Sequence, residues 1–422
     1  MRSFFCFSFL LLIAITSFAA DPMATNFSAV DCQGSLKPYV SPEKKYEYPD
    51  SLAPVFINHV GRHGSRFPAS STHCIQLRDA LNAAQSQGAI TAKGKELLSL
   101  VNYVIEKADG QWGALDSLGM DEQRGIAARM YDRYPNLFKD KQIEAISSYS
   151  PRCVMSMNSF THQLTRMNNS IDVTTRSGRS KSFLMRPFDV EMSYKDFMEL
   201  GFWKEPYLQQ FEKVVPTTAL TRVLGEEFNY GDVKPKDLAI IQYYVIAGLS
   251  AMQVECDATR YFTLEEYNAL WSCFNLRQYL QRTSTTISSV PADIASPLLC
   301  DLIVSIDSVV ARKGNTIVSA KLRFGHAETL MPLLSLMKLK DCNYRTNYFD
   351  TVALNWQDFN VVPMSANLQM ILFKTKSGKF YVRIDRNEVP VAFIPGSEDI
   401  YVSWDVARQY LSNCVPLYYQ TW

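Results

Sequence analysis

Residues 54–68 read PVFINHVGRHGSRFP, and the interpretation of the whole chain starts from this stretch. Residues 54–60 are mostly apolar, which is typical of a buried strand. Directly after them, His63 stands between Arg62 and Arg66. Two permanent cations lower the pKa of a neighbouring imidazole and keep it neutral, the form that can attack an electrophile. Guanidinium groups also offer planar sets of donors to a phosphate, so the motif predicts phosphoryl transfer through a phosphohistidine.

The motif is short, and short motifs also occur by chance. On that alternative, residues 62–66 form a solvated turn after a strand, with Gly64 supplying a permissive backbone. The choice between the two interpretations depends on two segments further along the chain.

The first of these segments is IEAISSYSPRC at residues 143–153. It predicts a buried strand, a loop, and a helix that begins near Pro151, because proline is well tolerated at a first helical position. Arg152 then lies at a helix N-terminus, where backbone N–H groups already favour an anion. Taken alone, Arg152 is equally compatible with a surface arginine.

The second segment is VSAKLRFGHAETLMPLL at residues 318–334, where an extended run gives way to a helical one. At the junction, His326 can donate to a phosphate oxygen and Glu328 can carry a proton to a leaving oxygen. Such an acid contributes roughly 10²–10⁴-fold when the leaving group is an alkoxide. Taken alone, the two residues are compatible with a structural histidine and a carboxylate at a helix start.

Together these segments resemble the histidine acid phosphatases, a branch of the histidine phosphatase superfamily with the signature R-H-G-x-R-x-P, complete at residues 62–68. The resemblance extends to the segment that ends at Arg152 and Cys153 and to the distal His326. The commonest family pattern follows that histidine with Asp, whereas residues 326–328 read HAE and resemble the multiple inositol polyphosphate phosphatase subgroup. Residues 118–123 (LGMDEQ) and 184–189 (LMRPFD) resemble two further segments of that subgroup.

The resemblance implies a role for each matching residue. His63 is expected to be the nucleophile, and Glu328 to protonate the leaving alcohol and then help to activate water. The phosphate oxygens are expected to be held by Arg62, Arg66, Arg152 and His326. No metal and no cofactor are expected, because His and Cys are not grouped at zinc spacing in the sequence.

Residues 1–20 are typical of a cleavable secretory signal: Arg2 precedes an apolar run, which is followed by the segment SFAA at residues 17–20. We therefore expect a secreted or periplasmic protein. The apolar run is too short to span a bilayer, and we expect no other membrane-spanning stretch and no membrane anchor. Loss of Arg2 changes the net charge from +1 to 0, which argues against nucleic acid as a partner.

Cleavage also leaves eight of the nine cysteines. An even number in an exported chain permits disulfides. Cys256 and Cys273 fall on successive helical segments and are the favoured pair, although cysteines in a chain of this size can also be buried thiols.

The fold class that we expect is α/β: a histidine-phosphatase-like α/β domain with a central mixed sheet flanked by helices, plus a mostly helical cap domain. Strand character occurs at residues 54–60, 143–149 and 317–324, and in a hairpin of 368–375 and 379–385 turned at Ser377 and Gly378. Residues 190–312 have helical spacing, with clear helices at 237–256 and 264–282. The expected division is an N-terminal arm at 21–53, a discontinuous α/β domain at 54–189 and 313–422, and a helical cap at 190–312.

Four cations at residues 176–186 lie just before the expected cap. A solvated basic loop accounts for most of them. Arg186 is the candidate specificity residue, because it matches the subgroup segment. One charge pair at 4 Å is worth about 4 kcal/mol at an effective dielectric near 20, so a few such cations decide selectivity.

The leading hypothesis is an exported, monomeric phosphomonoesterase that hydrolyses inositol polyphosphates, phytate above all, through a phosphohistidine. Its ligands are then inositol hexakisphosphate and lower inositol phosphates. The alternatives are a general acid phosphatase or 2,3-bisphosphoglycerate phosphatase, and a non-catalytic inositol-phosphate binding protein. The intact His63 and Glu328 argue against a purely binding role, because binding needs neither a nucleophile nor an acid.

Overall fold

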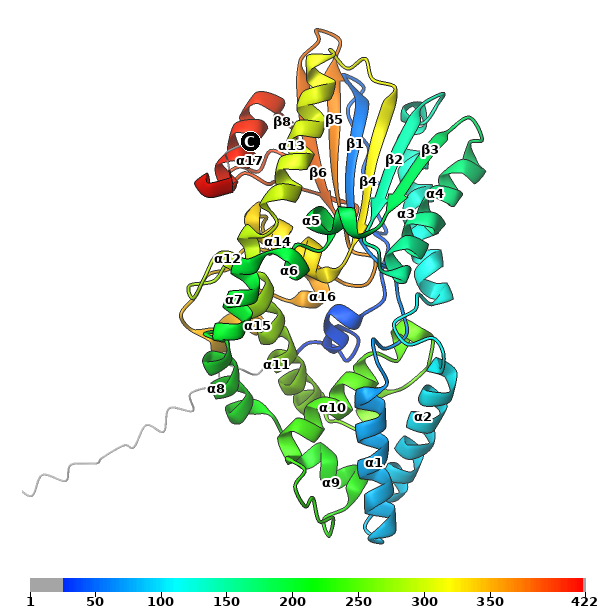
Figure 1. Cartoon of the computed structure of the whole chain (residues 1–422), viewed down its shortest axis with the longest axis vertical. Coiled ribbons are helices and arrows are strands. Elements are labelled where there is room, and N and C mark those ends of the chain that lie inside the picture. The colour runs from blue at the N-terminus through cyan, green and yellow to red at the C-terminus, as the bar shows by residue number, and fades with distance from the viewer. Residues whose placement is uncertain (1–25, 420–422) are drawn as a thin grey trace, which may run out of the picture.

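The structure is a computed structural model that describes residues 26–419. Its centre is a mixed sheet in the order β3–β2–β4–β1–β5–β6–β7, with β8 paired to β6 (Figure 1). The expected α/β fold with a mixed sheet flanked by helices is confirmed. The parallel strands are β1 (Leu52–Arg62), β2 (Gln142–Ser147), β3 (Asp172–Ser177) and β4 (Val318–Gly325). The antiparallel strands are β5 (Asn367–Thr375), β6 (Phe380–Arg386), β7 (Val389–Val391) and β8 (Val402–Ser403).

Both faces of the sheet are buried, and successive side chains of one strand point to opposite faces. Phe56 and Val60 of β1 belong to one core cluster, whereas Ile57 between them belongs to another. The same alternation separates Leu372 from Phe373 on β5. This double burial explains why β1 has the continuous apolar sequence of a parallel, covered strand.

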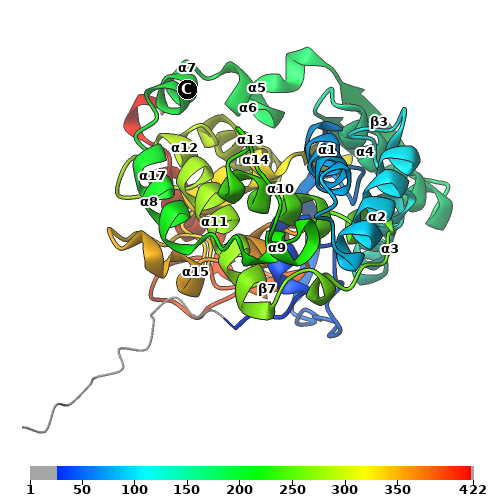
Figure 2. The ribbon, with the colours of Figure 1, turned by 90° about the horizontal axis from the view of Figure 1, so that it is seen from below.

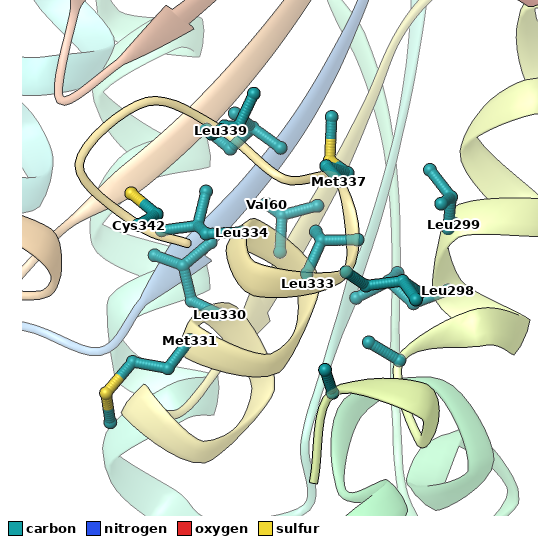
Figure 3. Packing of buried hydrophobic residues seen from close by; sticks show 14 of the residues in the cluster. Val60, Leu298, Leu299, Leu330, Met331, Leu333, Leu334, Met337, Leu339 and Cys342 are labelled. Carbon is teal, nitrogen blue, oxygen red and sulfur yellow. The ribbon is translucent and has the colours of Figure 1, made fainter. Parts of the chain in front are cut away.

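Helices cover each face of the sheet (Figure 1). One face packs against α3 (Ser117–Arg133) and α4 (Pro151–Met167). The other packs against α13 (Ser296–Ala311), α14 (Ala327–Leu336) and α17 (Trp404–Cys414). Figure 3 shows the second of these cores, in which Leu330, Leu333 and Leu334 of α14 pack near Val60 and Leu298. The packing fixes α14, and with it the residues at its N-terminus.

A second group of helices packs around a core of its own below the sheet (Figures 1 and 2). Its main members are α1 (Thr72–Ser86), α2 (Ala92–Ala108), α8 (Lys204–Val214), α9 (Thr218–Leu224), α10 (Pro235–Ala247) and α11 (Leu264–Arg282). Between the two groups lie α5 (Ser182–Met185), α6 (Pro187–Val190), α7 (Met192–Leu200), α12 (Val290–Asp293), α15 (Val352–Asn355), α16 (Asp358–Val361) and the 3₁₀ helix η1 (Asp31–Leu36).

The helical group draws on sequence from both sides of residue 190. Helices α1 and α2 precede that residue and pack against α10 and α9. Helix α13 lies within 190–312 and packs against the sheet. The expected division into domains at 190 and 313 stays a prediction.

Several expected elements are confirmed. Helix α11 spans Leu264–Arg282, α4 begins at Pro151, and β5 and β6 form the expected hairpin. In its turn, Gly378 has a φ of +86°, a conformation that favours glycine. The helix expected over 237–256 is shorter, because α10 ends at Ala247 and Gln253 adopts a left-handed conformation. The expected signal segment, residues 1–20, lies outside the described residues.

One stretch contradicts the expectation that no further segment is long and apolar enough to cross a membrane. Residues Val290–Ala311 meet that criterion by length and composition, with a mean hydropathy of 1.8. The reason is that α13 is a core helix, with Leu298, Leu299 and Leu302 buried against the sheet. A core helix and a membrane span can have the same composition. The absence of a membrane anchor stays a prediction.

The favoured disulfide is also wrong. All eight described cysteines are free, Cys256 and Cys273 among them. Cys273 is fully buried on α11, and Cys256 is a partly buried residue at the margin of the same core. A shared core therefore does not imply a bond between the two sulfur atoms. Burial raises the pKa of Cys273 to about 12, so this side chain is an unreactive thiol.

Candidate active site

The site lies at the edge of the sheet where β2, β4 and β1 end. These strands are parallel neighbours, with Arg62 paired to Gly325 and Ser147 paired to Phe324. Because parallel strands end at one edge, the loops that follow them gather there. His63 follows β1, His326 follows β4, and the loop after β2 leads to Arg152 at the start of α4.

A cavity of about 430 Å³ opens at this edge, between the strand ends and the helices α1, α10 and α11. Five of the residues singled out from the sequence line it: Arg62, His63, Arg66, Arg152 and Glu328. His326 and Arg186 are not among its lining residues, but His326 contacts Arg152 and Arg186 contacts His326. The fold therefore brings together all seven candidate residues from four separate segments of the chain.

His63 is buried, and its hydrogen-bond partner shows which ring nitrogen carries the hydrogen. Its Nδ1 lies 2.9 Å from the carbonyl oxygen of Gly64. A carbonyl can only accept, so Nδ1 carries the hydrogen and Nε2 keeps a free lone pair. Burial holds the pKa of His63 well below its ordinary value, and Arg62, Arg152 and Arg66 lower it further. The ring is therefore neutral, the state that attack on an electrophile requires, and its role as the nucleophile stays a prediction.

The arginines of the cavity have donors to spare. Arg62 donates from Nη1 to the carbonyl oxygens of Ser35 and Val362, both at 2.6 Å. Within residues 26–419, the buried Nε atoms of Arg62, Arg66 and Arg152 have no hydrogen-bond partner. Burial, together with the neighbouring Arg152 and Arg62, lowers the pKa of Arg66 to about 9. An anion would neutralise this repulsion and accept the free donors.

His326 lies among three polar groups. Arg186 Nη1 is 2.7 Å and Ser148 Oγ 2.9 Å from its Nε2, and Arg152 Nη2 is 3.3 Å from its Nδ1. Burial lowers the pKa of His326 to about 3; Arg152 and Arg186 act in the same direction, while Glu328 opposes them. A guanidinium can only donate, so the shorter contact assigns Nε2 as acceptor and leaves the hydrogen on Nδ1. Nδ1–H and Arg152 are then two adjacent donors that one anion can share.

Glu328 lies in the first turn of α14, whose position the core of Figure 3 fixes. Its Oε1 accepts from Arg282 Nη2 at 3.0 Å. Burial acts to raise the pKa of Glu328, but Arg282, His326 and Arg62 outweigh it and hold the pKa well below its ordinary value. The carboxylate is therefore ionised in this structure.

Arg186, the candidate specificity residue, packs on the far side of His326. It donates from Nε to Asp189 and stacks over the rings of Tyr149 and Phe188, both 4.9 Å from its guanidinium carbon. Its charge therefore acts on the site through His326 and through space.

A buried carboxylate beneath the nucleophile loop was missed by the sequence analysis. Glu122 of α3 accepts from the backbone N–H and the hydroxyl of Ser65, and from the hydroxyl of Ser365. Its neighbour Gln123 donates to the carbonyl of Arg62. Both residues lie in the segment 118–123, so the signal was a motif whose structural role the sequence alone does not reveal.

Two polar residues of α11 were also missed. Arg277 and Arg282 also line the cavity. Neither belongs to a motif, and α11 is buried around much of its circumference, so helical spacing does not separate a cavity face from a core face. Across residues 26–419, no three His, Cys, Asp or Glu side chains lie together as metal ligands. The charges that the cavity offers are mainly cations, which suit an anionic ligand.

The doubly covered sheet and the buried histidine among arginines define a phosphatase of the histidine type. The family model of the histidine phosphatase superfamily (branch 2) matches residues 55–190 of this chain. Over 411 residues it is 26% identical to multiple inositol polyphosphate phosphatase 1 of Gallus gallus, covering 90% of this chain and 86% of the relative.

Two solved structures share the fold. The multiple inositol polyphosphate phosphatase of Bifidobacterium longum in complex with inositol hexasulfate superposes with a TM-score of 0.75 at 18% identity, covering 92% of this chain and 99% of the other. The phytase from D. castellii gives a TM-score of 0.72 at 14% identity, covering 96% and 90%. At these identities the likeness concerns the fold alone.

Proposed function

We propose that this protein is an exported phosphomonoesterase that hydrolyses inositol polyphosphates, phytate among them, through a phosphohistidine at His63. One observation carries the proposal: a buried, neutral imidazole with a free Nε2 lines a cavity whose arginines have unpartnered donors. The substrate class is supported by the name of the Gallus gallus relative and by the inositol hexasulfate bound to the Bifidobacterium longum enzyme. Export is supported by the composition of residues 1–20.

In the first half of the reaction, Nε2 of His63 attacks the phosphorus atom of the ester. The P–N bond forms as the P–O ester bond breaks, and Glu328 gives its proton to the departing inositol oxygen. The negative charge that spreads over the phosphoryl oxygens is stabilised by donors from Arg62, Arg66 and Arg152 and from Nδ1–H of His326.

In the second half, water attacks the phosphohistidine. Glu328, now a carboxylate, takes a proton from that water as its oxygen bonds to phosphorus, and the P–N bond breaks. Inorganic phosphate leaves, and both His63 and the protonated Glu328 are restored. The reaction needs no group beyond the side chains and water.

Arg186 is proposed to favour substrates that carry several phosphates. Its guanidinium lies next to His326, and a cation there attracts the summed charge of a polyphosphate more than that of a monoester.

The test is phosphate release from inositol hexakisphosphate without added metal, beside p-nitrophenyl phosphate and a His63→Ala control. Release from the inositol substrate that the control abolishes supports both the nucleophile and the substrate class. Activity on the aryl ester alone would replace the proposal with a general acid phosphatase. Tight binding of inositol hexakisphosphate without turnover would replace it with a binding protein.

A further inference from the structure

The ion pair between Arg282 and Glu328 joins the two walls of the cavity. Arg282 is the last residue of α11, and Glu328 lies in the first turn of α14. The contact measures 3.0 Å, and the side chains are 17% and 35% exposed, so both can be reached from the cavity that they line. The pair therefore lines the cavity in which a substrate would bind.

The pair conflicts with the role of Glu328 as an acid. Arg282 is the strongest of the cations that favour its ionised form, and an ionised carboxylate has no proton to give. The other titratable or charged groups around Glu328 are His326, Arg62, Arg66, Cys153 and Tyr194. Of all these, Arg282 is the cation that bonds to Glu328 directly. A substrate that takes the hydrogen bonds of Arg282 would raise the pKa of Glu328, and the carboxylate could then be protonated.

Arg282 has the means to serve a second acceptor. Its Nη1 donates to Gln281, and its buried Nε has no partner among the described residues. Gln278 and Gln281 of the same helix also line the cavity, as does Arg277. The lining of the cavity thus includes donors from α11 in addition to those of Arg62, Arg66 and Arg152.

We propose that Arg282 is a positioning residue shared between Glu328 and the substrate, an inference that rests on the proposed function. A phosphate group next to the scissile one takes the donors of Arg282, and Glu328 then takes up the proton that it passes to the leaving oxygen. A phosphate dianion competes well for a guanidinium because it carries more charge than a carboxylate and accepts in the same bidentate way. A polyphosphate thereby activates the acid that cleaves it.

The proposal separates three kinds of substrate. Inositol hexakisphosphate has neighbouring phosphates and releases the acid. Glycerol 2-phosphate has an alkoxide leaving group but no second phosphate, so Glu328 stays paired with Arg282. p-Nitrophenyl phosphate has a leaving group that departs without protonation, so its kcat/KM, which reports phosphoryl transfer to His63, does not depend on the protonated form of Glu328.

The experiment is the pH profile of kcat on these three substrates, for the wild-type protein and for Arg282→Gln. An acid works only below its pKa in the complex, so activity falls as pH rises through that value. In the wild type, this alkaline limb lies at least about one pH unit higher for inositol hexakisphosphate than for glycerol 2-phosphate. In Arg282→Gln, the limb for glycerol 2-phosphate moves up by about one unit, and kcat at pH 6 rises roughly threefold to tenfold.

The same variant loses at least about tenfold in kcat/KM on inositol hexakisphosphate, as expected when a charge-assisted contact to a phosphate is removed. On p-nitrophenyl phosphate it stays within about twofold of the wild type. Arg282→Lys keeps the charge and retains the wild-type limb on glycerol 2-phosphate. Arg277→Gln is the matched control: it removes a cation from the same wall without touching Glu328, so it raises KM for inositol hexakisphosphate without moving that limb.

Coincident limbs for the two alkyl substrates in the wild type would overturn the proposal. So would equal losses of Arg282→Gln on all three substrates, the mark of a merely structural residue. Failure of the proposed function looks different, because the wild type itself then releases no phosphate from inositol hexakisphosphate.

Discussion

The carboxylate of Glu122 accepts both the backbone N–H and the hydroxyl of Ser65, at 2.8 and 2.6 Å. Ser65 is the second residue after His63, so this anion holds the loop that presents the nucleophile. Glu122 also accepts from the backbone N–H of Tyr39 at 2.9 Å and from the hydroxyl of Ser365 at 2.8 Å. Four donors on one buried carboxylate leave the loop little freedom to move.

Glu122→Gln should therefore reduce both stability and activity. The amide replaces one acceptor oxygen with a donor that faces the donors around it, at a cost of about 1–3 kcal/mol in the free energy of unfolding. Urea denaturation measures that loss, and kcat on p-nitrophenyl phosphate reports the displaced loop. Glu144→Gln on β2 is the matched control, since its half-exposed pair with Lys321 should change stability by at most about 0.5 kcal/mol. Equal effects of the two changes would contradict a special role for Glu122.

Arg186→Ala should lower kcat/KM more for inositol hexakisphosphate than for p-nitrophenyl phosphate. The guanidinium lies 2.7 Å from His326 and acts on every phosphate of a bound polyphosphate, whereas the aryl ester presents only one. The ratio of the two kcat/KM values in variant and wild type is the measurement. A loss of the same size on both substrates would mean that Arg186 acts only by holding His326 in place.

Strands with a strongly apolar sequence could be predicted from the sequence, and so could turns that are marked by turn-forming residues. The strand β1 was found from its apolar run, and the β5–β6 hairpin from its Ser377–Gly378 turn. The edge strand β3 was missed, because its residues DVTTRS are almost all exposed and polar. It is held by backbone pairing to β2, which leaves no pattern in the side chains.

The candidate site likewise contains residues that could be predicted from the sequence and residues that could not. His63 and its two arginines are adjacent in the sequence, so their chemistry could be predicted from it. Arg282 and Glu328 are separated by 46 residues, and Glu122 and Ser65 by 57. Contacts of this kind depend on how helices pack, and nothing in the local sequence of α11 or α3 indicates them.

The titration of Asp358, considered by itself, should make the protein more stable at pH 4.5 than at pH 7. Its carboxylate accepts from Ser35 N–H and Trp271 Nε1–H, and burial raises its pKa to about 6 from an ordinary value of 3.8. Between these values the folded state binds the proton and the unfolded state does not, so stability falls as pH rises through this window. The fall amounts to about 2–3 kcal/mol. Asp358→Asn cannot titrate, so urea denaturation at the two pH values should show a loss in the wild type that is absent from the variant. The same pH dependence in both proteins would contradict the assignment.

Gly119→Ala should damage the nucleophile loop, because α3 approaches it through this residue. A Cβ atom at Gly119 would lie 2.2 Å from the carbonyl oxygen of Ser65 and 2.6 Å from its nitrogen, and backbone cannot yield as a flexible side chain does. The loop must shift, and a misplacement of about 1 Å can cost on the order of 10²-fold in rate. Gly125→Ala in the same helix is the matched control, since its Cβ would meet only the end of Arg129 at 3.0 Å. Alanine is the better helix former by about 1 kcal/mol, so Gly125→Ala should keep kcat and hold or raise the melting temperature. Full activity in Gly119→Ala, measured on p-nitrophenyl phosphate, would show that the close approach of the two backbones does not set the position of His63.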